Sequence, residues 1–174
     1  KAIAFGSDEQ SNMAAATYTI TLPVEVASIA DLVSLGASET IYNLTSTVTV
    51  TLFNGGNRHQ SYIQDATGGM LVDDPSDILV NAGPIGRQFI NLICKLQAYG
   101  GWFEIVPLQV PDIADINPAN PEEEAVEDID ESYVGKLIAV RNLTIDGSGD
   151  FEASHSYNFN ESGNIVLRTQ YPNF

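Results

Sequence analysis

The 174-residue sequence predicts an all-β protein. Apolar residues alternate with threonine along residues 44–52, and a period of two is the pattern of a half-buried strand. Glycine, asparagine, aspartate and proline recur at short intervals, as they do at the turns between strands. A helical pattern covers only residues 29–35, where Ser28 is the expected N-cap and Gly36 ends the helix.

Five strand-like segments lie between residues 44 and 106. A meander of three strands comes first, then a loop over residues 73–86, then a hairpin. A five-stranded Greek-key barrel of the OB type has this order, and an open β-sandwich is the alternative. The expected strands are residues 44–52, 60–64, 70–72, 88–97 and 103–106, joined by turns at 54–57, 65–69 and 99–102.

Composition divides the chain into four regions. Residues 1–27 are expected to be an extended N-terminal lead-in with a short edge strand at 18–22, and residues 28–110 form the OB-fold domain. Residues 111–132 contain nine acidic residues and no basic one, which predicts an exposed acidic linker. Calcium binding is the alternative for this segment, but its spacing fits no calcium-loop signature. Residues 133–174 are expected to form a second, incomplete OB-like β unit.

The second unit is expected because the sequence contains an internal repeat. Residues 60–72 and 155–167 share the pattern Ser-Tyr-x-x-(Asp/Asn)-x-(Thr/Ser)-Gly-x-apolar, at a constant offset of 95 residues. We interpret the match as a duplication. The second copy lacks its fourth and fifth strands, which leaves an open edge. The strand at residues 18–22 could pair there, or the unit could pack on the first barrel, but we expect instead that the natural protein continues beyond Phe174.

The repeat leads to a prediction about hairpin geometry. In the first copy, Gly68 or Gly69 is expected at positive φ, and Asp65 is expected to cap the turn by accepting a backbone N–H. In the second copy, Asn160 and Gly163 are expected to take the places of Asp65 and Gly68, with the strands paired in the same register.

The segment Tyr62-Ile-Gln-Asp-Ala-Thr-Gly-Gly-Met-Leu-Val72 resembles the strand 2–3 hairpin of OB-fold modules in surface lipoproteins and secreted proteins of Bacteroidetes-type bacteria. The resemblance covers residues 38–108, and more weakly residues 133–170. It implies an OB-type barrel, and such modules are often labelled nucleic-acid-binding. Arg87 departs from the pattern, since the family tends to have an acidic or polar residue there, and the short second unit is a further departure.

Charge and cysteine content restrict the functions that the chain can have. The formal net charge of −16 disfavours binding to phosphate backbones. The single cysteine, Cys94, lies in a strand-like run and is expected to be a buried hydrophobic residue. Only 17% of residues are charged, which is typical of secreted β proteins, so we expect an extracytoplasmic location, with any lipid anchor upstream of Lys1.

The expected binding site lies on the face of the second and third strands, between two loops of the barrel. Aromatic and guanidinium groups gather there in the sequence, and such groups stack on sugar rings or bases. No pattern of catalytic or metal-binding residues stands out, and no cofactor is expected. The candidate ligand-binding residues are Trp102, Tyr99, Tyr62, Arg58, His59 and Asn57.

These features predict a non-enzymatic extracytoplasmic binding or assembly module that contacts a glycan or a protein at the cell surface. One alternative is a protein that binds single-stranded nucleic acid, since OB-folds are widely used for that purpose. A second alternative is an accessory domain of a secreted hydrolase.

Overall fold

The computed structural model describes residues 16–17, 19–53, 58–79 and 84–169. Over this part of the chain the protein is mostly β, as the sequence predicts. The elements are β1 (Val24–Val26), α1 (Ile29–Leu35), β2 (Ser38–Leu44), β3 (Val48–Phe53), β4 (Ser61–Gln64), β5 (Gly69–Val72), β6 (Arg87–Ile90), β7 (Leu92–Tyr99), β8 (Trp102–Pro107), β9 (Asp112–Ile116), β10 (Glu122–Glu124), the 3₁₀ turns η2 (Val126–Asp128) and η3 (Glu131–Tyr133), β11 (Ile138–Val140), β12 (His155–Phe159) and β13 (Ser162–Thr169).

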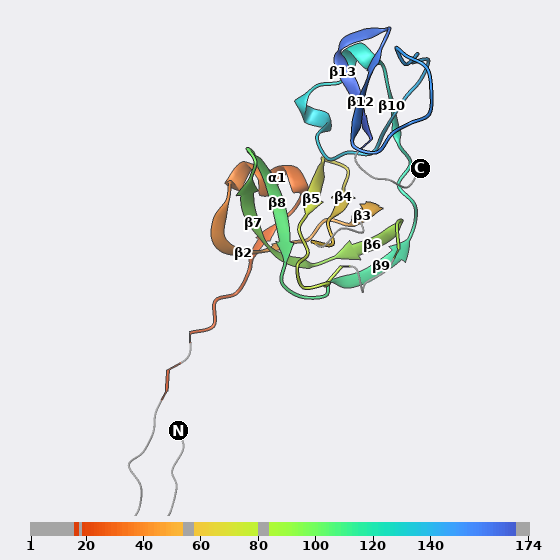
Figure 1. The fold of residues 1–174 in the computed structure, drawn as a ribbon. Helices are drawn as coiled ribbons and strands as arrows, with labels where there is room; N and C mark the ends of the chain where they lie inside the picture. Colours follow the sequence, from red (N-terminus) through yellow and green to blue (C-terminus); the bar gives the residue numbers. More distant parts are fainter. Residues whose placement is uncertain (1–15, 18, 54–57, 80–83, 170–174) are drawn as a thin grey trace, which may run out of the picture.

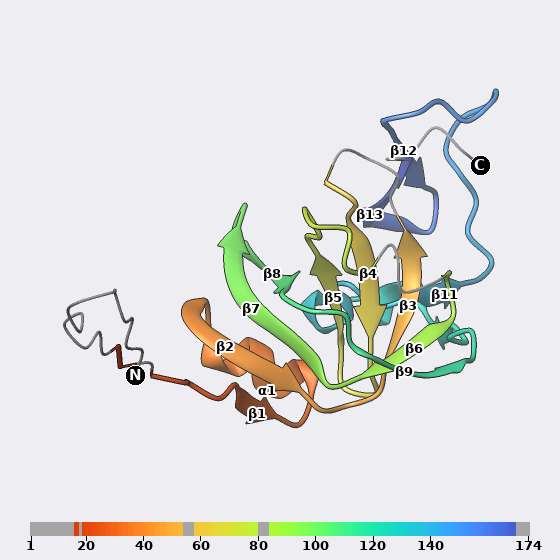
Figure 2. The same ribbon diagram turned by 90° about the horizontal axis from the view of Figure 1, so that it is seen from below.

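Nine of these strands form one curled sheet, a half-barrel (Figures 1 and 2). Their spatial order is β1-β2-β7-β8-β5-β4-β3-β6-β9. Neighbouring strands in the series β7-β8 and β5-β4-β3 are antiparallel, whereas β5 and β8 are parallel. Strands β10 and β11 form a small parallel sheet, and β12 and β13 form a separate hairpin (Figure 1).

Helix α1 has the bounds that the sequence predicts. The Ser28 hydroxyl accepts a hydrogen bond from the backbone N–H of Asp31, and Gly36 ends the helix with a φ of 72°. Ile29 and Leu32 are fully buried, so this helix covers part of the core. The helix therefore packs an apolar face against the core.

The edge strand predicted at residues 18–22 is wrong. Residues 19–23 form no strand, and Ile20 and Leu22 are exposed to solvent. Strand β1 begins directly after Pro23 and pairs with β2 in parallel. Proline has no N–H to give to a ladder, so pairing starts where donors become available.

Two of the predicted strands are each divided in two. The pattern predicts one strand over residues 44–52, but β2 ends at Leu44 and β3 begins at Val48. Residues 88–97 are interrupted at Asn91, whose φ is 56°. Each break bends the chain, so that β2 pairs with β7 while β3 pairs with β4 and β6. The curl of the sheet depends on these bends.

The breaks also change which side chains face the core. Val48 and Val50 are buried as predicted, but Leu52 is exposed because a bulge lies between Val50 and Leu52. After the break at Asn91 the predicted residues Leu92, Cys94 and Leu96 are buried, but before it Phe89 is buried in place of the predicted Ile90. The largest fully buried side chains are Phe89, Ile29, Leu32, Leu44, Ile63, Leu79, Leu92, Leu96 and Ile105.

Cys94 is buried in this core, as the sequence predicts. Burial raises the pKa of its thiol to about 12, because a thiolate loses its hydration there. At neutral pH the thiol is therefore not ionised and acts as a small apolar side chain.

The segment predicted as an acidic linker is partly ordered in strands. Asp112–Ile116 form β9, which pairs with β6 at one edge of the sheet, although every residue of β9 is exposed. Glu122–Glu124 form β10, which pairs with β11. The linker prediction is therefore wrong for these residues, because the edge of β6 offers free backbone groups that β9 satisfies. The four domain boundaries stay predictions.

The β4–β5 loop is organised by the Asp65 carboxylate. One oxygen, Oδ1, accepts hydrogen bonds from the N–H and hydroxyl of Thr67, each 2.7 Å long, and from the N–H of Gly68 at 3.1 Å. The other, Oδ2, accepts from the N–H of Ile29 at 2.9 Å and the hydroxyl of Ser46 at 2.8 Å. The predicted cap is confirmed, and it also joins the loop to α1 and to the β2–β3 connection.

The glycine prediction for this loop is wrong, since neither Gly68 nor Gly69 has a positive φ. Gly69 is instead required by close packing. A Cβ at Gly69 would overlap the carbonyl group of Gly135, and one at Gly135 would lie 2.6 Å from the carbonyl carbon of Gly69. The two glycines allow the backbone around residue 135 to lie directly on β5.

The second hairpin does not repeat the first. Tyr62 pairs with Leu71 across β4 and β5, but Tyr157 pairs with Leu167, one residue away from the corresponding register. The loop between β12 and β13 is shorter than the β4–β5 loop, and Gly163 lies within β13 rather than in the turn. A one-residue slip moves side chains to the opposite face, so the predicted structural repeat is wrong.

We expect Asp65→Asn to lower the free energy of unfolding at pH 7 by about 2 kcal/mol, because it weakens several hydrogen bonds to a charged acceptor. Burial tends to raise the pKa of Asp65, but hydrogen bonds from Thr67, Ile29 and Ser46 outweigh it and hold that pKa below its usual value. The stabilisation is therefore complete above the unfolded pKa near about 4 and is lost as the pH falls through the folded pKa.

Urea unfolding of the wild type and of Asp65→Asn between pH 7 and pH 2 measures this difference. It should be constant above about pH 5 and should shrink below about pH 4. Asp115→Asn is the control, because Asp115 is exposed and its carboxylate accepts from the adjacent Ile116 N–H. A pH-independent difference would contradict the role given to the Asp65 charge.

We expect Gly69→Ala to separate the chain around Gly135 from β5, because the added methyl group overlaps backbone atoms that cannot move independently. Limited proteolysis should then cleave residues 130–137 faster than in the wild type. Gly163→Ala is the matched control, since no atom lies within 4 Å of the position that its methyl group would take and its φ is not positive. Equal cleavage rates in both variants would contradict the packing argument.

Candidate functional site

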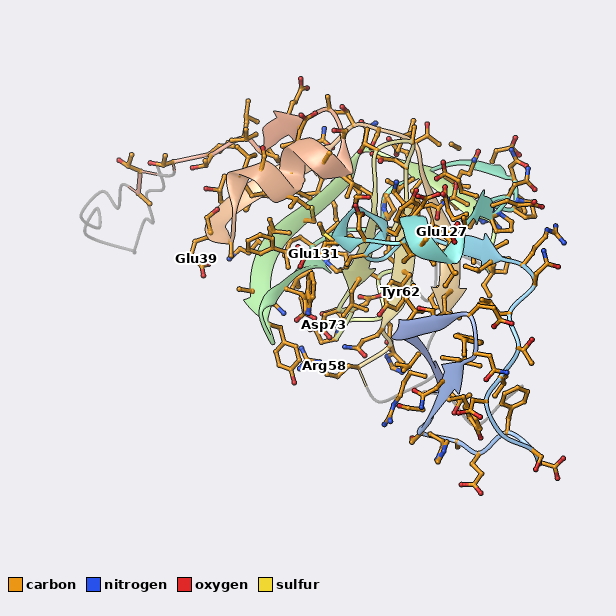
Figure 3. The ribbon with its side chains drawn as sticks, turned by 90° about the horizontal axis from the view of Figure 1, so that it is seen from above. Glu39, Arg58, Tyr62, Asp73, Glu127 and Glu131 are labelled. Carbon is orange, nitrogen blue, oxygen red and sulfur yellow. The ribbon has the colours of Figure 1, made fainter. Side chains whose placement is uncertain are left out.

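A cavity of about 680 Å³ lies against the outer face of β4, β5 and β8. Helix α1 forms one side, the β7–β8 turn forms another, and residues 130–137, here called the wall segment, form a third. Figure 3 looks onto this side of the molecule and labels Tyr62 and Glu131. The lining residues are Ile29, Ala30, Val33, Tyr62, Thr67, Gly68, Gly69, Met70, Leu71, Tyr99, Gly100, Trp102, Phe103, Glu104, Glu131, Ser132, Val134 and Gly135.

The floor of the cavity is a row of cross-strand neighbours. Tyr62 pairs with Leu71, Leu71 pairs with Glu104, and Glu104 pairs with Gln97. Since side chains alternate along a strand, Trp102 lies on the same face of β8 as Glu104, while Ile105 faces the core. Pairing across four strands therefore places an aromatic, an aliphatic and an acidic side chain side by side.

Three of the predicted site residues meet at this cavity: Tyr62, Tyr99 and Trp102. Tyr99 and Trp102 pair across the β7–β8 turn and are 63% and 56% exposed. The turn between them is tight, with φ values of 61° at Gly100 and 90° at Gly101, a conformation that favours glycine. The sequence Tyr-Gly-Gly-Trp thus presents two large rings at the mouth of the cavity.

The wall segment is held in place at three points. The Asp130 carboxylate accepts from the N–H of Ser132 at 2.8 Å and so begins η3. The backbone of Gly135 lies against Gly69, and the N–H of Leu137 donates to the Gln64 side chain at 2.9 Å. These contacts bring Glu131 and Val134 to the cavity from a distant part of the chain.

Arg58 lies beside the cavity and binds carboxylates. Its guanidinium forms a bidentate pair with Asp73, with Nε donating to Oδ1 at 2.7 Å, and lies 3.8 Å from Glu104 Oε1 (Figure 3). The hydrogen bond and charge of Asp73 raise the pKa of Arg58. Its guanidinium carbon is also 5.6 Å from the centre of the Tyr99 ring, within cation–π range. Arg58 therefore supports the site from outside the lining.

His59, which was also predicted to bind the ligand, does not join this group. His59 pairs through Nδ1 with Asp77, and both residues have positive φ, 45° and 57°. His59 does not line the cavity. Asn57 lies outside the described residues.

Glu104 is the residue that sequence analysis missed. It is only 2% exposed, and its Oε1 accepts a hydrogen bond of 2.5 Å from Gln97, but its Oε2 is buried without a hydrogen-bond partner. A buried acceptor without a partner is costly, and such groups often belong to functional sites. The signal in the sequence was a lone acid within the apolar run Trp-Phe-Glu-Ile-Val of β8.

The carboxylates of Asp73 and Asp74, in the acidic loop over residues 73–77, form contacts within the protein. The Asp74 carboxylate accepts from the N–H groups of Ile78 and Leu79 at 2.8 and 2.6 Å, which is the turn-capping role. Asp73 is paired with Arg58. Among the residues that the structure describes, no group of three or more His, Cys, Asp or Glu side chains is placed to hold a metal ion.

We expect Arg58→Ala to lower the urea midpoint far more than Arg141→Ala does. Arg58 neutralises Asp73, which is 2% exposed, beside the equally buried Glu104. Its removal leaves two carboxylates buried without their cation, which is strongly destabilising. Arg141 pairs with exposed Glu123, and surface pairs contribute little. Equal midpoints for the two variants would contradict the structural role of Arg58.

Comparison of the chain with protein-family models, with curated proteins and with solved structures finds no match. Within the described part of the chain, no helix is long and apolar enough to cross a membrane. The cavity combines the rings of Tyr62, Tyr99 and Trp102 with a largely apolar lining and a buried acid, Glu104.

Proposed function

We propose that this protein is a non-enzymatic extracytoplasmic binding module that holds a glycan or protein partner in the cavity of an OB-type barrel. The observation that carries the proposal is the convergence of Tyr62, Tyr99 and Trp102 on one cavity of about 680 Å³. Ligand sites are usually concave, largely apolar, and fitted with a few polar groups, and cavities of this size are typical.

Strand connectivity supports an OB-type barrel. The bent pairs β2/β3 and β6/β7 can each be counted as one long strand. The five strands in chain order are then β2/β3, β4, β5, β6/β7 and β8. Numbered 1 to 5, they lie in the sheet in the order 1-4-5-3-2, and the order returns to strand 1 through β3. The parallel pair β5–β8 then joins the third and fifth strands. A five-stranded Greek-key barrel has this arrangement, and its ligands usually bind on the face of strands 2 and 3. The cavity lies on that face.

The chemistry of the lining favours binding over reaction. Exposed aromatic rings offer large contact areas to sugar rings or apolar side chains. Neither His59 nor His155 lines the cavity, and the Cys94 thiol is buried in the core. The low share of charged residues, 17%, supports an extracytoplasmic location. An accessory domain of a secreted hydrolase would bind its partner through the same surface.

Nucleic-acid binding is the weaker candidate. An OB-fold that binds single strands needs a basic groove along the backbone path. In the described structure Arg58 is paired with Asp73, Lys95 with Glu39, and Arg141 with Glu123. The net charge of −16 adds a repulsive field.

We expect Trp102→Ala to weaken partner binding at least tenfold, because it removes a large aromatic ring that is 56% exposed at the mouth of the cavity. Glycan arrays and pull-downs from surface-protein fractions find the partner, and titration calorimetry measures its affinity. Phe151→Ala is the control, since Phe151 is an exposed aromatic residue that does not line the cavity.

Two results would overturn the proposal. One is partner binding that Trp102→Ala leaves unchanged. The other is tight binding of labelled single-stranded DNA, measured by fluorescence anisotropy, that weakens as salt rises, without any glycan or protein partner.

A further inference from the structure

The charged groups of the cavity are all of one sign. Glu104 and Glu131 line it, and among its lining residues, all within the described part of the chain, none is Lys, Arg or His. Two described cations lie close to this lining, Arg58 and Lys136 of the wall segment. The bidentate pair of Arg58 is with Asp73, and Glu104 lies farther from it at 3.8 Å. The ammonium of Lys136 lies over the Tyr133 ring. One guanidinium therefore serves two buried carboxylates, and Glu104 is the more distant of the two.

One atom of Glu104 lacks a hydrogen-bond partner. Oε1 of Glu104 accepts from Gln97, whereas Oε2 has no hydrogen-bond partner although the residue is 2% exposed. A carboxylate oxygen in such surroundings gains most from a charged donor, because charge-assisted hydrogen bonds are about twice as strong as neutral ones. An anion or a carbonyl oxygen would be repelled at this position.

We propose that the cavity binds a cationic side chain, lysine or arginine, of a polypeptide partner, with its charged nitrogen donating to Glu104 Oε2. This inference rests on the proposed function and names the ligand class of the same site. Tyr62, Tyr99 and Trp102 line the same cavity as Glu104. Aromatic faces attract cations, and they also contact the methylene stem that carries the charge.

A polypeptide fits this site better than an amino sugar does. Glu104 Oε2 is buried, so a partner that reaches it must arrive on a thin, flexible stem. The ammonium of lysine stands on four methylene groups, whereas the amino group of a sugar is attached directly to a bulky ring. The net charge of −16 also accelerates the approach of basic partners.

The chain provides its own probe, because its single tryptophan is Trp102. We expect Nα-acetyl-lysine methylamide and its arginine counterpart to change Trp102 fluorescence in a saturable way. Nα-acetyl-norleucine methylamide has a similar apolar stem without the ammonium, and it should bind at least tenfold more weakly. This comparison uses the wild-type protein and so is independent of any effect of mutation on folding.

Glu104→Gln should lower the affinity for the lysine probe at least tenfold, while it preserves the side-chain oxygen that accepts a hydrogen bond from Gln97. Glu39→Gln is the matched control: it removes the same charge from an exposed residue that pairs with Lys95 outside the cavity, and it should leave the affinity unchanged. Urea unfolding of both variants identifies any loss of binding that follows from unfolding.

Three results would overturn the inference. The first is equal affinity for the norleucine and lysine probes, and the second is full affinity in folded Glu104→Gln. The third is binding of glucosamine oligomers through Glu104 with no response to the lysine probe, which would assign the site to a cationic glycan. Trp102-dependent binding of a neutral glycan, with no cationic probe bound, would overturn this inference while leaving the proposed function intact.

Discussion

The structure depends on the Asp65 carboxylate, which joins three parts of the chain at one point. Its two oxygens bind the loop between β4 and β5, the first turn of α1 and the β2–β3 connection. The N–H of Ala30 also donates to the Thr67 hydroxyl, at 3.1 Å. Because Ile29, Ala30 and Thr67 all line the cavity, the same contacts that stabilise the hairpin also build one side of the candidate site.

The opposite side is built by a contact between two glycines. Gly69 and Gly135 bring β5 and the wall segment to a separation that no side chain permits. The wall segment therefore narrows the open face of the sheet to a bounded cavity and adds Glu131 to it. In the OB-type barrel proposed above, this face would be the one that binds single strands, and Asp130 and Glu131 of the wall segment would disfavour a ligand with a phosphate backbone.

Local features of the sequence predict much of this structure. The cap at Ser28, the turn at Gly100 and the cap at Asp65 each depend on neighbours in the chain, and all three are found. The break at Asn91 was missed, because a strand that pairs with partners at two places bends for reasons that lie in those partners. Glu104 was missed for a similar reason: its importance comes from an oxygen that no neighbouring strand satisfies.

The central claim is that the cavity between Trp102 and Glu104 is where this protein meets its partner. A crystal structure of the protein with a lysine-containing peptide tests that claim most directly. We predict a basic side chain in the cavity, with its charged nitrogen within hydrogen-bond distance of Glu104 Oε2 and its stem against the Trp102 ring. A peptide bound elsewhere on the protein, with the cavity filled only by water, would contradict the account.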